Sequence, residues 1–176
     1  MIKKLLLSLV LLAFAASLQA AEGPKAGVGL HMTPEMMRGM VHQSMQIYPL
    51  ADDVSMDDAI ESMKLRANNL NFKLVAELPL SKQVEAMGKK ARRMDILAFC
   101  DALIAKEMVE FDPIFAGFLP CRIALIEGAD GKGMIVTMNM DMMLNAVDLP
   151  DNLIPLAETV RDSIYSIVDA GVNGDL

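Results

Sequence analysis

The sequence predicts an α+β fold, in which helices pack on a mainly antiparallel four-stranded sheet within a single domain. Apolar runs and two-residue alternation predict strands, and apolar residues three or four apart predict helices. The glycine-rich turn from Gly128 to Gly133, with Asp130-Gly131 inside it, predicts a hairpin. The four predicted strands cover residues 72–78, 94–100, 122–127 and 134–140.

Capping residues predict where the helices of the first half begin and end. Thr33-Pro34 is a favourable helix start, and this helix should run to about Met45 before Tyr48-Pro49 closes the segment. Ser55, three residues before Asp58, predicts the start of a second helix. Asn71 suits a left-handed turn between that helix and the first predicted strand.

The second half carries similar signals. Asp101 is placed to cap a helix directly after the strand 94–100, and Asp141 to cap a short helical turn. After Pro150, apolar residues recur at helical spacing and predict a final amphipathic helix that ends at Gly171.

The first twenty residues have the form of a secretory signal peptide. Lys3 and Lys4 precede the apolar run 5–16, and the small-residue exit 17–20 suggests cleavage after Ala20. The run is too short to span a membrane comfortably. We therefore expect an exported, periplasmic protein with no integral membrane segment after cleavage.

The charge balance excludes some partners. Loss of Lys3 and Lys4 moves the formal net charge from −7 to −9, and the basic residues at 89–93 form only a short cluster. A chain this acidic is poorly suited to nucleic acid or to an anionic membrane surface. The partners that the charge balance leaves open are an unidentified small ligand, a protein partner or a second copy of the chain.

Two long stretches resemble a known family. ILAFCDALIAKEMVEFDPIFAGFLPCRIALIE, followed by the hairpin, and SMDDAIESMKLRANNLNFKLVAELPL resemble the bacterial family catalogued as domain of unknown function 302, over roughly Asp53 to Leu144. The resemblance implies a small α+β domain that often self-associates, and it implies no activity or cofactor. The chain then divides into a signal peptide (1–20), a lead-in with a Met/His-rich helix (21–46) and the α+β domain (47–176).

Cys100 and Cys121 are the candidate redox or disulfide residues. As a disulfide they would close a loop of about 22 residues, which is worth roughly 3 kcal/mol. Parallel strands would hold them on the order of 20 Å apart, whereas antiparallel strands would bring them to one edge of the sheet. A structural disulfide, a functional thiol pair and two inert buried thiols are the three interpretations.

The second candidate site is rich in methionine and histidine. His31, Met36, Met40, His42 and Met45 fall near the start of the mature chain. Thioether and imidazole groups suit Cu(I), so copper is a candidate cofactor. The alternative is that these methionines pack against an apolar surface.

The sequence lacks the motifs of common enzymes: it has no GxSxG, HExxH, CxxC or CxxCH pattern. We therefore expect a non-catalytic, exported binding or accessory protein that forms a homodimer. The alternatives are a periplasmic thiol-redox or sulfur-transfer factor that uses the cysteine pair, and a Cu(I) carrier.

Overall fold

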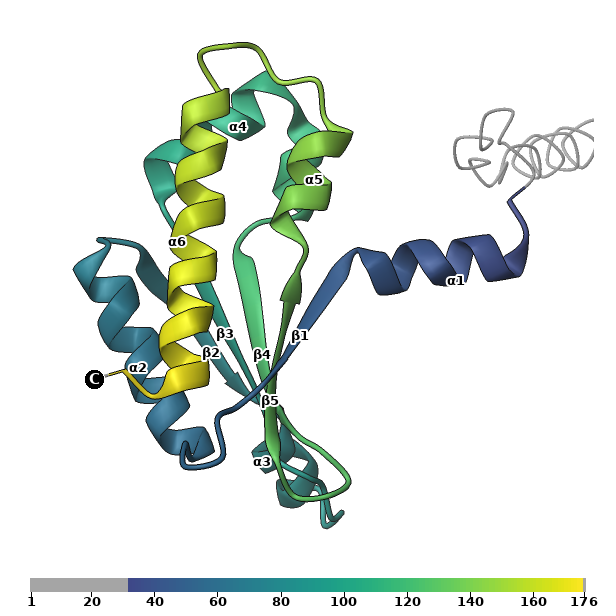
Figure 1. The fold of residues 1–176 in the computed structure, drawn as a ribbon, viewed down its shortest axis with the longest axis vertical. Coiled ribbons are helices and arrows are strands. Elements are labelled where there is room, and N and C mark those ends of the chain that lie inside the picture. Colours follow the sequence, from purple (N-terminus) through teal and green to yellow (C-terminus); the bar gives the residue numbers. More distant parts are fainter. Residues whose placement is uncertain (1–31, 176) are drawn as a thin grey trace, which may run out of the picture. The chain divides into compact units, whose positions relative to one another are not determined.

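The computed structural model describes residues 32–175, and residues 1–31 and 176 lie outside it. The predicted signal peptide and His31 therefore fall outside the described residues. The elements, drawn in Figure 1, are α1 (Pro34–Gln43), β1 (Met45–Pro49), α2 (Met56–Asn69), β2 (Lys73–Pro79), α3 (Leu80–Ala86), β3 (Met94–Cys100), α4 (Ala102–Phe111), the 3-10 helix η1 (Pro113–Gly117), β4 (Cys121–Glu127), β5 (Gly133–Met138), α5 (Met140–Ala146) and α6 (Ile154–Asn173).

The sheet is antiparallel throughout and has five strands in the order β1-β5-β4-β3-β2. The α+β class and the antiparallel sheet are confirmed. The predicted number of four strands is wrong, because β1 adds a fifth strand at the edge beside β5.

The missed strand β1 lies where the sequence predicted the end of a helix. The helix stops at Gln43, and Met45 already belongs to β1. Tyr48 pairs with Ile135 of β5, and the amide of Asn139 donates a hydrogen bond of 2.8 Å to the carbonyl of Ser44. Because these partners lie about 90 residues further along the chain, no local sequence pattern indicates that residues 45–49 form a strand.

Local capping signals are confirmed. The amide of Asp58 donates to Ser55 Oγ (3.1 Å), and the amides of Leu103 and Ile104 donate to Asp101 Oδ1. Asn71 has a φ of 56°, so it takes the left-handed conformation that the sequence predicted. Such signals act within a few residues, which is why the sequence alone reveals them.

Two predicted boundaries in the second half are wrong. Asn139 rather than Asp141 caps α5, by accepting a hydrogen bond from the amide of Met142. The last helix continues past Gly171 and ends at Asn173, followed by the C-cap Gly174, which has a φ of 68°. Gly171 serves packing instead, since a Cβ atom there would lie 2.6 Å from Cγ of Met63.

Helices α2 and α6 lie on one face of the sheet, side by side (Figure 1), and bury the main core against it. The alternation of strand residues sends one set of side chains toward these helices. The buried members of this core are Ala59, Ile60, Met63, Ala67, Phe72, Leu97, Phe99, Ile123, Leu125, Ile135, Met140, Ile164, Ile167 and Val168.

The other strand residues form what we call the open sheet face. Their side chains point away from α2 and α6, and most are only partly covered; Ile47, for example, is 61% exposed. The apolar residues of this face include Met45, Ile47, Ala76, Leu78, Ile96, Ala98, Ala124, Ile126, Met134, Val136 and Met138.

Candidate functional site

A cavity lies at one end of the sheet, where β3 ends and β4 begins. Figure 1 shows α4 and α5 gathered at this end, whereas α3 lies at the opposite end. Here the main core meets a second buried cluster made by Met108, Phe115, Leu153 and Ala157. The cavity opens between these two clusters, with a volume of about 70 Å³.

Six of the side chains that line the cavity carry sulfur, so we call it the sulfur-lined cavity. The remaining wall is mostly aliphatic and aromatic, including Phe72, Ile104 and Val160. Asp101, Arg122 and Thr137 are the polar lining residues. The six sulfur-bearing residues are Cys100, Met108, Cys121, Met138, Met140 and Met143.

Strand and helix ends position the two cysteines. Cys100 is the last residue of β3, and Asp101 starts α4 by accepting hydrogen bonds of 2.9 and 3.1 Å from two backbone amides. Cys121 is the first residue of β4, directly after Pro120. The strand-to-helix junction and the strand start therefore hold both thiols at the same end of the sheet.

The antiparallel pairing of β3 and β4 brings the cysteines close together. Phe99 pairs with Cys121, so Cys100 is offset by a single residue. One strand spacing and one residue rise put the two Cα atoms about 6 Å apart, within the separation that a disulfide bridges. In the structure both are free thiols. Neighbouring strand residues point to opposite faces, which works against a bond between them.

Both thiols are held in the protonated form at neutral pH. Burial, and to a smaller extent the charge of Cys100, raise the pKa of Cys121 to about 11, although Arg122 opposes the shift. Burial and then the carboxylate of Asp101 raise the pKa of Cys100. Because the thiolate is the nucleophile, neither thiol is activated for attack in the resting protein.

The polar groups around the cavity are already satisfied by the protein. The hydroxyl of Thr137 donates to the carbonyl of Arg122 at 3.0 Å, and Asp101 is occupied with the amides of α4. Within residues 32–175, no buried side-chain nitrogen or oxygen lacks a hydrogen-bond partner. What the cavity offers a ligand is therefore apolar surface and sulfur.

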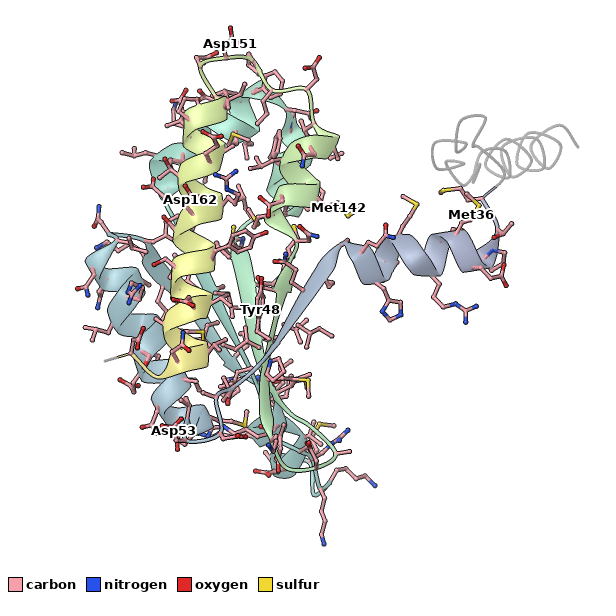
Figure 2. All side chains as sticks on the ribbon, in the orientation of Figure 1. Met36, Tyr48, Asp53, Met142, Asp151 and Asp162 are labelled. Carbon is pink, nitrogen blue, oxygen red and sulfur yellow. The ribbon has the colours of Figure 1, made fainter. Side chains whose placement is uncertain are left out.

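The methionines and histidines of the second candidate site are spread over two elements. Met36, Met40 and His42 lie on α1, whereas Met45 lies on β1. No residue of α1 is buried, and Figure 2 labels Met36 on this helix. Among the residues that the structure describes, no three His, Cys, Asp or Glu side chains gather to hold a metal.

The sequence predicts the two cysteines as a candidate site but not the cavity around them. Ile104 and Met108 of α4 line the cavity, whereas Phe111 of the same helix is 44% exposed. Met138, Met140 and Met143 are also lining residues. Helix α6 contributes Ala157 and Val160; its apolar spacing predicted the helix, but nothing in the sequence indicated that it reaches the cavity.

The fold and the cavity define a small α+β domain with an antiparallel sheet and a sulfur-rich, apolar cavity at one end. The family described as Domain of unknown function DUF302 matches residues 48–171, and the chain belongs to this family. The resemblance seen in the residues ended at Leu144, whereas the family match extends to residue 171 and so includes most of α6.

One solved structure is a protein of similar fold. It is an uncharacterized conserved DUF302 protein from Bacillus stearothermophilus, 16% identical, with a TM-score of 0.60; the match covers 72% of this chain and 97% of the other. At this identity the likeness concerns the fold alone. No curated protein matches the chain.

Proposed function

We propose that this chain is an exported, non-catalytic binding protein whose sulfur-lined cavity takes a small apolar ligand. The observation that carries the proposal is a cavity of about 70 Å³ whose wall is apolar apart from three residues. A buried water needs about 10–15 Å³ by a comparable measure, so the space suits a small molecule or the end of a longer one. Binding sites are commonly apolar and concave in this way.

The groups near the cavity support the proposal of a non-catalytic role. The thiols are protonated, and Asp101, the carboxylate beside Cys100 in the cavity lining, raises the pKa of that thiol and accepts hydrogen bonds from two backbone amides of α4. The two histidines of the chain, His31 and His42, both precede β1 in the sequence. Export rests on the signal-peptide pattern of residues 1–20.

A titration with toluene and with 1-hexanol, followed by NMR of labelled methionine methyl groups, tests the binding proposal. We expect the methyl resonances of Met108 and Met140 to shift, while that of Met87, which is 79% exposed, stays in place. Ala157→Leu fills part of the cavity and should abolish the shifts, because Ala157 is 4% exposed and lines it.

Ala86→Leu is the matched control, because Ala86 is an exposed helical alanine on α3. It should bind like the unmodified chain. Equal binding by the Ala157→Leu variant, or no shift of any cavity methionine with either molecule, would contradict the proposal.

A thiol-redox or sulfur-transfer factor is the second candidate, favoured by the short offset between Cys100 and Cys121 across adjacent strands. It requires the pair to cycle through a disulfide, whereas the binding proposal needs two thiols. Intact mass after alkylation separates these functions. Two thiols that alkylate without reductant support the binding protein, and thiols that alkylate only after reduction support the redox factor.

We also propose that the protein forms a homodimer through the open sheet face. Apolar side chains such as Ile47 and Leu78 are exposed on this face, which is the kind of surface that proteins cover by association. No helix among the described residues has the length and apolar character to cross a bilayer. A second copy of the chain is the occupant that the family resemblance implies.

A further inference from the structure

We propose that α1 is an exchange arm: its apolar stripe, formed by Met37, Met40 and Val41, packs on the open sheet face of a second copy of the chain. This arrangement rests on the homodimer proposed above, and it identifies α1 as the segment that covers the face. Each copy donates one helix and receives one, as a two-fold dimer requires.

The apolar stripe of α1 is exposed in the single chain. Its three residues follow the i, i+3, i+4 spacing of one helix face, and Met37, Met40 and Val41 are 53%, 46% and 65% exposed. Glu35 and Arg38 lie on the opposite side of the helix, as their positions in the sequence require. A helix with this pattern normally turns its apolar side toward other parts of a protein, yet no residue of α1 is buried.

A helix as short as α1 needs such packing. It has 10 residues, and isolated helices shorter than about 12–15 residues are marginally stable in water. Gly39, in the interior of α1, lowers the stability of the helix further. Because the single chain buries none of the side chains of α1, we infer that the stabilising contacts come from another molecule.

The junction with β1 keeps α1 away from the sheet of its own chain. Ser44 is the one residue between the two elements; its amide donates to the carbonyl of Met40 (2.9 Å) and its hydroxyl to the carbonyl of Val41 (2.8 Å). The side-chain amide of Asn139 donates to the carbonyl of Gln43 at 3.1 Å. Figure 1 shows α1 extending outward from the edge of the sheet at β1. A connection this short and this well bonded does not let α1 turn back over its own open sheet face.

The open sheet face has the size and the character to receive α1. A helix of 10 residues is about 15 Å long, and strands about 4.8 Å apart place three of them beneath it. The three central strands each present a partly exposed apolar side chain there: Ile96 on β3, Ile126 on β4 and Val136 on β5. An amphipathic helix on an apolar sheet face is the two-layer packing by which domains bury such surfaces.

Sedimentation equilibrium of the chain of residues 21–176 tests the exchange arm. The triple variant Met37→Gln, Met40→Gln, Val41→Gln removes the apolar stripe and keeps residues that favour a helix. We expect the dissociation constant of the dimer to rise by roughly 100-fold or more, because the apolar contacts of α1 are lost at two symmetric sites.

The matched control places three glutamines on the opposite side of the same helix, in the variant Glu35→Gln, Arg38→Gln, His42→Gln. It removes one acidic and one basic residue, so the formal net charge is unchanged. This variant should form a dimer like the unmodified chain.

NMR of mixed dimers locates the arm. One batch of the chain carries labelled valine methyl groups and the other labelled isoleucine methyl groups, so a contact between the two labels joins two copies. We expect contacts from Val41 to at least one of Ile47, Ile96 and Ile126.

The possible results separate the exchange arm from the homodimer itself. A dimer that persists in the apolar-stripe variant overturns the exchange arm and leaves the homodimer in place, whereas a monomeric unmodified chain overturns both. Equal loss of the dimer in the two triple variants, or contacts of Val41 only with residues outside the open sheet face, would also overturn the exchange arm. So would binding of a monomeric chain through α1 to vesicles of phosphatidylethanolamine and phosphatidylglycerol, because α1 would then cover itself on a membrane surface.

Discussion

At the scale of single residues, Cys121 couples its protonation to the stability of the fold. Its pKa is about 11 in the folded protein, against 9.0 for an unperturbed thiol, mainly because it is buried. The folded state therefore holds the proton more tightly than the unfolded chain. This contribution is complete below about pH 9 and is lost as the pH rises through about 11.

The pH dependence of unfolding checks this coupling. In urea titrations of the reduced protein, we expect the free energy of unfolding to fall by up to roughly 2–3 kcal/mol between pH 9 and 11 because of Cys121. Other groups titrate in the same range, so the comparison is with Cys121→Val, which has no proton to lose. The variant should show a shallower decline, and equal slopes for the two proteins would refute the coupling.

The confirmed residue predictions all concern contacts within a few positions. Ser55 and Asp101 cap helices, and Asn71 takes a positive φ, because the side chain of each interacts with its own neighbouring backbone. Gly171 was misread for the opposite reason. Because it has no side chain, Gly171 allows close packing with Met63 and Ile135, two residues far away in the sequence.

At the scale of elements, β1 is the feature that sequence reasoning missed. The strand has only five residues and ends in Pro49, which is too short for a recognisable strand alternation. The helical spacing of the preceding residues also continues to Met45. The strand forms because β5 offers its hydrogen-bonding edge and because Tyr48 can pack against the main core. Both causes are tertiary, so they are absent from any local window of the sequence.

The two faces of β1 should respond differently to truncation. Tyr48 is partly buried against the core, and its hydroxyl donates to Gln46 Oε1 at 2.7 Å, so Tyr48→Ala should lower the free energy of unfolding by about 1–3 kcal/mol. Ile47 is 61% exposed on the open sheet face of the single chain, and Ile47→Ala should change the free energy of unfolding of the monomer by less than about 0.5 kcal/mol. Urea denaturation at protein concentrations low enough to keep the chain monomeric measures both, and a larger effect at Ile47 there would contradict the register of β1.

At the scale of the whole molecule, the cavity shows why site prediction from sequence was incomplete. Its wall is assembled from β3, α4, η1, β4, β5, α5 and α6. Each of these elements except η1 was predicted from its own stretch of the sequence. Whether Cys100 and Cys121 meet depended on strand direction, which the sequence left open and the antiparallel register decides.

The open sheet face leads to a prediction about assembly. We expect the unmodified protein to sediment as a dimer, and Ile47→Lys to shift it toward monomer, because a buried unpaired charge is costly in an interface. Leu65→Lys is the matched control: Leu65 is 42% exposed on α2, away from this face, and its replacement should leave the dimer intact.

Sedimentation equilibrium over a range of concentrations measures the effect. A monomer for the unmodified protein, or a dimer that persists in the Ile47→Lys variant, would contradict assembly through this face. Since Ile47 is exposed in the single chain and its replacement should leave the fold of the monomer nearly unchanged, a loss of dimer in the lysine variant indicates a loss of association.

The position of β1 also has a consequence for how the chain must be made. A polypeptide that leaves a ribosome or a translocation channel from its N-terminus delivers β1 first and β5 last, yet these two strands are neighbours in the sheet. Until Met138 has emerged, residues 45–49 have no strand to pair with. The first strand to appear is therefore among the last to be incorporated, and the sheet cannot close while the chain is still in transit.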